Sequence, residues 1–339
     1  MICPEIIATI GLPFDEESVN IKMNNSLNNG IKSFRFNLSK CSIEEIEKLI
    51  NSITKNKLME DCNIMLDLPY PGRKTRISFK DDQFTHDFKA GEIVIITGKK
   101  GHIEDSKAEV IFVDNEDIYK AVSVGQELIY SDGDCILSVV QVDEKSGYII
   151  AKISNTIKMY TRKSLSYNYV VKESVNQDYI DLINRVKPSS VAFSFVTDLN
   201  SLLTCSNGIL DKNIEIISKI ETADSMDNVE EIATSSSLML GRGDLILNSE
   251  IYKLYEYQVN ISKISKKLNK KLYIATGILT SLRQQPIPTP AEITDLYNIM
   301  LCQPDAIILN AELIASDNVE AAVKLIRKTA SVAYKQQSE

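Results

Sequence analysis

The 339-residue sequence has no Trp, two His and no Cys-x-x-Cys pair. Its six cysteines are scattered along the chain: Cys3, Cys41, Cys62, Cys135, Cys205 and Cys302. Their spacing fits neither a zinc motif nor a disulfide framework, so we expect reduced thiols in the core. His86 and His102 have no Ser or carboxylate at a telling spacing, which argues against a nucleophilic triad built on His.

Several longer patterns are also absent. No run approaches the roughly 20 apolar residues that span a bilayer, and the first five residues give no signal-peptide start, so we expect a cytoplasmic protein without membrane association. The net charge is −8, with 38 Lys and Arg against 46 Asp and Glu, and no basic stripe favours a nucleic-acid partner. Neither a Gly-x-Gly-x-x-Gly turn after a strand nor a P-loop motif occurs.

The sequence does contain eight short apolar runs that alternate with amphipathic segments. They lie at residues 6–10, 34–38, 64–68, 191–195, 214–220, 238–240, 272–275 and 306–309. Capping-box patterns at Ser42 and Thr289, each with Glu three residues later, mark two helix starts. The alternation predicts an α/β fold, a TIM (β/α)8 barrel with its reactive groups at the carboxyl ends of the strands.

Between residues 77 and 162 the pattern changes to a period of two, broken by turn sequences such as Lys145-Ser146-Gly147. This predicts a small antiparallel β domain inserted after the third barrel strand. The expected boundaries are 1–76 and 163–339 for the barrel and 77–162 for the inserted domain.

Two charged segments are candidates for chemistry. Lys219 and Glu221 alternate on one predicted strand, so both side chains face the barrel mouth, and Asp244 follows the next strand in a turn bracketed by glycines. Two carboxylates with room for water suit Mg²⁺. The same spacing also fits an ion network that only stabilises the strand ends.

Arg35 and Asn37 alternate on the second strand, and Ser39 follows on the same face. A guanidinium in this place can hold phosphate by two parallel hydrogen bonds, although a polar strand end that stabilises loops fits equally. Asp67 and Thr276 end strands three and seven, where either alone is more often a cap than a catalyst.

The chain resembles the pyruvate kinase family across nearly its whole length. The motifs that carry the resemblance are Thr9-Ile10-Gly11, Phe34-Arg35-Phe36-Asn37-Leu38-Ser39, Lys219-Ile220-Glu221, Arg242-Gly243-Asp244-Leu245, Ala275-Thr276 and Pro288-Thr289-Pro290-Ala291-Glu292. The resemblance implies a TIM barrel with a lid-like B domain after strand three. It also implies a phosphotransferase that passes the phosphoryl group of phosphoenolpyruvate to ADP.

The resemblance also implies roles for individual residues. Glu221 and Asp244 correspond to the Mg²⁺ ligands, Lys219 and Arg35 to the cations on the phosphoryl group, and Thr276 to a Thr near the enolate carbon. The backbone of Gly243 and Asp244 corresponds to the part that holds the substrate carboxylate. Asn37, Ser39 and Asp67 match the family's K⁺ site, and Lys74, Lys163 and Asn37 match the nucleotide side.

The departures from the family gather on that nucleotide side. The family's Asp-Thr-Lys-Gly-Pro-Glu-Ile-Arg-Thr is here residues 67–75, in which Gly72 replaces the Glu associated with K⁺ dependence and Lys74 replaces Arg. Arg73 or Lys74 offers a substitute positive charge. The chain stops where the family's C-terminal domain begins, so we expect no control by sugar phosphates, and dimerisation through the barrel stays open.

We therefore predict a Mg²⁺-dependent phosphotransferase that transfers a phosphoryl group between phosphoenolpyruvate, or a related enol phosphate, and ADP or ATP. An acceptor that differs from the family's stays open. One alternative is a lyase or aldolase of the phosphoenolpyruvate/pyruvate barrel class that uses a metal-bound enolate. Another is a binding protein without catalytic activity.

Overall fold

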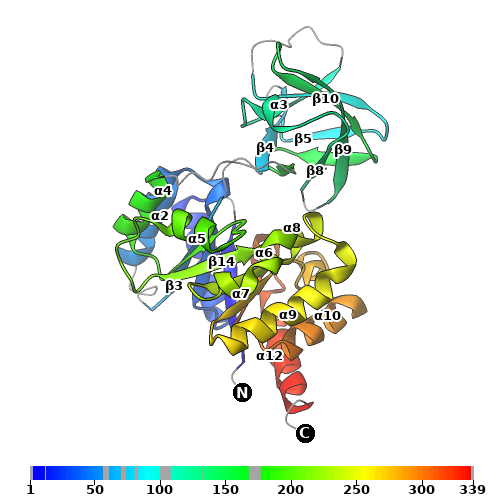
Figure 1. Ribbon diagram of the computed structural model, residues 1–339. Coiled ribbons are helices and arrows are strands. Elements are labelled where there is room, and N and C mark those ends of the chain that lie inside the picture. Colours follow the sequence, from blue (N-terminus) through cyan, green and yellow to red (C-terminus); the bar gives the residue numbers. More distant parts are fainter. Residues whose placement is uncertain are drawn as a thin grey trace. The chain divides into compact units, whose positions relative to one another are not determined.

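The computed structural model describes residues 3–11, 13–55, 61–69, 74–80, 83–99, 108–131, 133–167 and 177–336 (Figure 1). The chain forms two compact units: one comprises Met1–Pro69 and Glu173–Glu339, the other Tyr70–Lys172. This division assigns strands β4 (Lys74–Ser78) and β12 (Ser164–Ser166) to the second unit, because they pair with each other.

The first unit is a closed barrel of eight parallel strands, in the order β1-β17-β16-β15-β14-β13-β3-β2. The strands are β1 (Glu5–Ile10), β2 (Ser33–Asn37), β3 (Asn63–Leu68), β13 (Ser190–Phe193), β14 (Glu215–Ile220), β15 (Ser237–Gly241), β16 (Leu272–Ala275) and β17 (Ala306–Leu309). Each predicted apolar run overlaps one of them. The prediction of a TIM barrel is confirmed.

Helices surround these strands (Figure 1). They are α1 (Glu16–Asn28), α2 (Ile43–Lys55), α4 (Gln177–Val186), α5 (Leu199–Ser206), α6 (Ala223–Asp227), α7 (Val229–Ile232), α8 (Arg242–Leu247), α9 (Leu254–Lys267), α10 (Pro290–Leu301), α11 (Ala311–Ile314) and α12 (Val319–Gln336), with 3-10 turns η1 (Leu38–Lys40), η4 (Ile251–Lys253) and η5 (Thr280–Arg283). Both predicted capping boxes form, at Ser42 with Glu45 and at Thr289 with Glu292. None of the described helices is long and apolar enough to cross a bilayer.

Two successive layers of inward-facing residues lead up to the carboxyl ends of the barrel strands. The lower layer is an apolar cluster that includes Ile7, Met65, Ala192 and Ile217. Since alternate strand residues share a face, the residues two positions further along point inward above this cluster. They are Thr9, Asp67, Ser194 and Lys219. The barrel interior therefore changes from apolar to polar toward the carboxyl ends of the strands.

The second unit has its own closed barrel of seven strands, in the order β10-β6-β7-β4-β12-β8-β9, and a separate pair of strands, β5 with β11. Besides β4 and β12, these are β5 (Thr85–Phe88), β6 (Ile93–Thr97), β7 (Glu109–Val113), β8 (Glu127–Tyr130), β9 (Cys135–Asp143), β10 (Tyr148–Ile153) and β11 (Ile157–Tyr160), with the short helix α3 (Ile118–Ala121). The expected antiparallel pairing holds except between β6 and β7, which are parallel.

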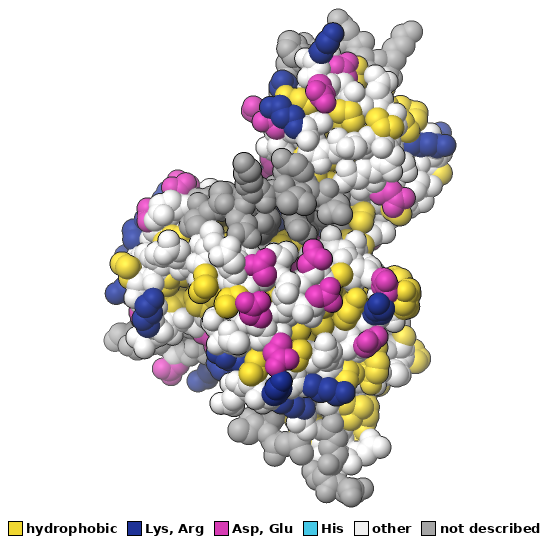
Figure 2. Space-filling view, viewed as in Figure 1, with side chains coloured by type: hydrophobic (Ala, Val, Ile, Leu, Met, Phe, Trp, Pro, Cys, Tyr) yellow, Lys and Arg dark blue, Asp and Glu magenta, His cyan; other side chains and the backbone are white. Residues whose placement is uncertain are grey.

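The six cysteines are all free, as expected, but only Cys135 and Cys302 are buried and Cys3 is exposed. The expectation that all six lie in the core is therefore wrong. On the face drawn in Figure 2, acidic side chains are interspersed with hydrophobic and basic ones.

Candidate active site

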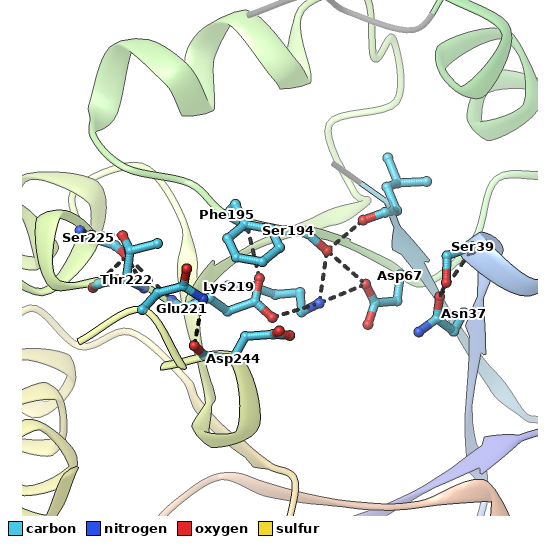
Figure 3. A network of polar contacts seen from close by, with 12 residues as sticks. Asn37, Ser39, Asp67, Ser194, Phe195, Lys219, Glu221, Thr222, Ser225 and Asp244 are labelled. Atoms are coloured by element: carbon cyan, nitrogen blue, oxygen red, sulfur yellow. Dashed lines mark hydrogen bonds and ion pairs between the residues drawn. The ribbon is translucent and has the colours of Figure 1, made fainter. Parts of the chain in front are cut away.

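A polar network joins five adjacent barrel strands, β1, β2, β3, β13 and β14, at their carboxyl ends, and Figure 3 shows the part of it from Asp67 to Glu221. Arg35 on β2 donates from Nε to Oδ2 of Asp67 on β3 at 2.7 Å, and from Nη1 to Oγ1 of Thr9 at 3.0 Å. The ammonium of Lys219 on β14 lies 3.2 Å from Oδ1 of Asp67 and donates to Ser194 Oγ, after β13, at 2.8 Å. Two cations from different strands therefore share one carboxylate.

The Asp67 carboxylate is the centre of this network, and the residue is 1% exposed. Burial raises the pKa of its carboxyl group, but the charges of Lys219 and Arg35 outweigh this effect and hold the pKa below its ordinary value. Asp67 therefore stays ionised and fixes the directions of both cations.

Lys219 is 8% exposed and also lies 3.0 Å from Oε1 of Glu221. Burial lowers the pKa of its ammonium group, whereas Asp67 and Glu221 raise it, and the net pKa is raised. The expectation that Lys219 and Glu221 share a face is confirmed. A buried, permanently charged ammonium suits stabilisation of an anion.

The Glu221 carboxylate is fixed from two further sides. Its Oε2 accepts a hydrogen bond of 2.9 Å from the backbone N–H of Phe195, whose φ of 53° is unusual for a bulky residue. A Cβ on Gly241 would lie 2.7 Å from Cγ and 2.8 Å from Oε1 of Glu221. The glycine is therefore needed so that the carboxylate can lie against the backbone of β15.

The sequence predicted that Asp244 lies in a loop bracketed by glycines. In the structure it lies in the first turn of helix α8 instead. Strand β15 ends at Gly241, and helix α8 begins at the next residue, Arg242. Figure 3 shows the Asp244 side chain beside those of Glu221 and Lys219. The predicted approach of the two acidic residues is thus retained by a different local structure.

These two carboxylates are the residues that could hold a divalent cation. No group of three or more His, Cys, Asp or Glu side chains that could hold a metal occurs among the described residues. Mg²⁺ keeps several water ligands and commonly needs only one or two protein carboxylates. Glu221 and Asp244 therefore fit Mg²⁺ and are too few for a closed site of protein ligands alone.

Thr276 follows β16 and is exposed, with a φ of 72°. A Cβ on Gly243 would lie 2.7 Å from the Thr276 methyl carbon, so the methyl group is against the start of α8. Arg242, which precedes Gly243 in the sequence, forms an ion pair with Asp295 on α10. The structure thus brings Thr276 and Gly243 together at the carboxyl ends of β15 and β16.

The remaining predicted residues have other surroundings. Asn37 lies opposite Asp67 in the strand register. Its Oδ1 accepts hydrogen bonds from the backbone N–H and the hydroxyl of Ser39, so Asn37 caps η1. Lys74 and Lys163 belong to the second unit. The side chain of Lys74 and the whole of Gly72, Arg73 and His102 lie outside the described residues.

Sequence reasoning missed three participants: Ser194, the backbone N–H of Phe195 and the hydroxyl of Thr9. A signal for two of them was present, because Ser194 and Thr9 lie two residues after inward-facing apolar residues of their strands. The Phe195 contact involves backbone only and has no side-chain signature.

Comparison with known proteins agrees with this geometry. The family model for the pyruvate kinase barrel domain matches residues 3–323. A pyruvate kinase of Thermotoga maritima is 29% identical over 98% of this chain and 71% of its own length. One of Staphylococcus haemolyticus is 29% identical, over 96% of this chain and 56% of its own length, and one of Dictyostelium discoideum is 26% identical, over 96% and 65%.

The chain thus spans 56% to 71% of the length of these relatives. The matched residues include every barrel strand and the polar layer at the strand ends. With its barrel, its charged carboxyl-end network and a family match over most of its residues, this chain belongs to the pyruvate kinase family.

Proposed function

We propose that this protein catalyses Mg²⁺-dependent phosphoryl transfer between phosphoenolpyruvate, or a closely related enol phosphate, and ADP. The observation that carries the proposal is the shared carboxylate of Asp67, which fixes the Arg35 guanidinium and the Lys219 ammonium at one end of the barrel. Phosphoryl transfer needs mainly fixed positive charge and correct positioning, and this arrangement supplies both.

Arg35 is suited to hold the phosphoryl group. Its Nε and Nη2 donate to Asp67 and its Nη1 donates to Thr9, so the orientation of the guanidinium is fixed. The guanidinium carries five N–H donors in all, so donors remain for phosphate oxygens. Its side chain is 16% exposed, which leaves an edge accessible to substrate.

Lys219 is suited to the charge that develops during transfer. The bond between phosphorus and the enol oxygen breaks, with its electron pair left on that oxygen, while a terminal phosphate oxygen of ADP forms the new bond to phosphorus. The products are ATP and an enolate, which takes one proton at its methylene carbon to give pyruvate. A buried ammonium that needs no reorientation lowers the cost of this charge movement.

Glu221 and Asp244 would hold the Mg²⁺ ion, which when bound neutralises negative charge on phosphate and enolate oxygens. The Glu221 carboxylate is held in a fixed position by Lys219, by the backbone N–H of Phe195 and by the close approach of Gly241. In this proposal the Gly243 and Asp244 backbone holds the substrate carboxylate, and the Thr276 hydroxyl lies near the methylene carbon that is protonated.

The nucleotide and K⁺ assignments belong to the same proposal. Lys74, Lys163 and Asn37 are proposed to contact the phosphates of ADP, and Asn37, Ser39 and Asp67 to bind K⁺. One feature bears on the K⁺ assignment: each oxygen of Asp67 already accepts from a cationic side chain. We therefore propose that these fixed cations supply part of the charge a bound K⁺ would provide, so that K⁺ stimulates turnover only weakly.

The test is pyruvate release from phosphoenolpyruvate, measured with and without ADP, Mg²⁺ and K⁺. We expect release that needs both ADP and Mg²⁺ and is abolished by Lys219→Met. Turnover that is independent of ADP would favour a lyase acting through the enolate. Binding of phosphoenolpyruvate without turnover would refute the proposed kinase activity and favour a binding protein without catalytic activity.

A further inference from the structure

The loop after β16 has an unusual backbone conformation. Thr276, Gly277 and Leu279 have φ values of 72°, 74° and 49°. For a β-branched residue such as Thr, positive φ is a true outlier and strains the backbone. The surrounding structure must hold Thr276 in this conformation.

The guanidinium of Arg242 holds it. Nε and Nη2 donate to the carbonyl oxygen of Thr276 at 3.0 and 2.8 Å. Nη1 and Nη2 also donate to the two carboxylate oxygens of Asp295 at 2.7 and 2.8 Å, and Nη1 lies 3.5 Å from Gln258 Oε1. These contacts use all five N–H donors of the side chain, so Arg242 has none left for a substrate.

Arg242 is itself fixed by its surroundings. Its side chain is 8% exposed, and the bidentate pair with Asp295 sets the plane of the guanidinium from helix α10. The hydrogen bonds to Thr276 thus join the first residue of α8 to the end of β16. Arg242 therefore connects helix α8, which contains Asp244, with the loop after β16, which contains Thr276.

The strained conformation leaves the Thr276 hydroxyl available. Its methyl carbon lies against Gly243, the residue is exposed, and its Oγ1 has no hydrogen-bond partner in the part of the chain that the structure describes. If the strained backbone buried the Thr276 side chain, the strain could be explained by packing. Here the Thr276 side chain stays exposed beside the start of α8.

We propose that Arg242, oriented by Asp295, is a positioning residue that fixes the Thr276 hydroxyl for proton transfer at the enolate carbon. This inference rests on the proposed function. Arg242 touches neither substrate nor metal; it acts only through the Thr276 carbonyl.

The test compares Arg242→Lys, Thr276→Val and the double variant, with Arg185→Lys as control. Lysine keeps the charge but cannot hold carbonyl and carboxylate together. Arg185, on α4, makes a similar bidentate pair with Glu47 on α2. Two rates are measured: pyruvate formation, and exchange of the methyl hydrogens of pyruvate with D₂O, followed by NMR.

We expect Arg242→Lys to lower the ratio of hydrogen exchange to phosphoryl transfer about 10–100-fold, because a small displacement of a reacting group costs this much. Partial unfolding would lower both rates and leave the ratio unchanged. The double variant should match Thr276→Val, since Arg242 acts through Thr276. An unchanged ratio in Arg242→Lys, or additive effects in the double variant, would overturn the proposal.

A second measurement separates this proposal from the proposed function. The ¹³C-labelled methyl signal of Thr276 should shift in Arg242→Lys and stay in place in Arg185→Lys. If the wild-type protein turned over no phosphoenolpyruvate, the proposed function would fail, and this signal alone would decide whether Arg242 positions Thr276. A signal unmoved by Arg242→Lys would refute the positioning role itself.

Discussion

The ammonium nitrogen of Lys219 lies 3.2 Å from Oδ1 of Asp67, although strand β13 separates their strands in the barrel. The Lys side chain spans this intervening strand, and Ser194, which follows β13, accepts a hydrogen bond from the ammonium on the way. The contact therefore joins β3, β13 and β14 at their carboxyl ends.

Replacing this ammonium should abolish catalysis. In Lys219→Met we expect kcat for pyruvate formation to fall by at least about 10²–10³-fold, the loss typical of removing one group that stabilises transition-state charge. The control is Lys271→Met: this lysine pairs with Glu215 at 2.7 Å, but its side chain is 56% exposed. Activity within about twofold of wild type in Lys219→Met would contradict the proposed role.

Asp67→Asn should act on substrate binding and on stability. It removes the negative charge that orients Arg35, so we expect KM for phosphoenolpyruvate to rise about tenfold, equivalent to one hydrogen bond to a charged group. Breaking a buried ion pair costs about 3–5 kcal/mol in the free energy of unfolding, which urea denaturation would measure. A variant with unchanged KM would show that Arg35 does not depend on Asp67 for its orientation.

Gly241→Ala should weaken Mg²⁺ binding. The added methyl group would lie 2.7 Å from Glu221 Cγ, on the rigid backbone of β15, so the carboxylate has to move. We expect the Mg²⁺ concentration for half-maximal activity to rise about tenfold or more, while Ser194→Ala, which leaves Glu221 in place, should change it little. Equal Mg²⁺ dependence in wild type and Gly241→Ala would exclude Glu221 as a ligand.

Glu292→Gln should remove an acid-sensitive contribution to stability. Burial raises the pKa of the Glu292 carboxyl group, but hydrogen bonds from Ser281 and Thr289 outweigh this, and the net pKa lies below its ordinary value. The stabilisation is therefore complete above the unfolded-state pKa of about 4.3 and is lost as the pH falls through the lower folded-state value.

Thermal unfolding of the two proteins at several pH values would test this prediction. The wild type should be more stable than Glu292→Gln by about 1 kcal/mol at pH 7, as expected for a helix cap, and the difference should shrink below about pH 4. A difference that is constant with pH would mean that the carboxylate charge is not responsible.

Much of the barrel could be predicted from the sequence because the signals are periodic. Apolar runs of strand length gave the eight strands, and the period of two placed Lys219 and Glu221 on one face. The capping patterns at Ser42 and Thr289 marked the starts of α2 and α10, since hydroxyl and carboxylate at that spacing satisfy the first-turn N–H groups.

Other parts of the site depend on tertiary contacts and have no local signal. The bracketing glycines predicted a turn at Asp244, but they serve close approaches: Gly241 to Glu221 and Gly243 to Thr276. Thr276 has a positive φ and its carbonyl oxygen accepts hydrogen bonds from Arg242, whereas the sequence there is that of an ordinary strand end. The parallel pairing of β6 with β7 depends on strands brought together by the second barrel.

The register of the barrel has a consequence for how the polypeptide acquires its structure during synthesis. β1 pairs with β17 from Glu5 opposite Ala306 to Ala8 opposite Leu309, so one edge of β1 stays unpaired until residues 306–309 have been synthesised. The strands that contain Arg35, Asp67 and Lys219 emerge well before that moment. These strands can therefore pair as an open sheet before β17 is available, and the pairing of β1 with β17 closes the barrel.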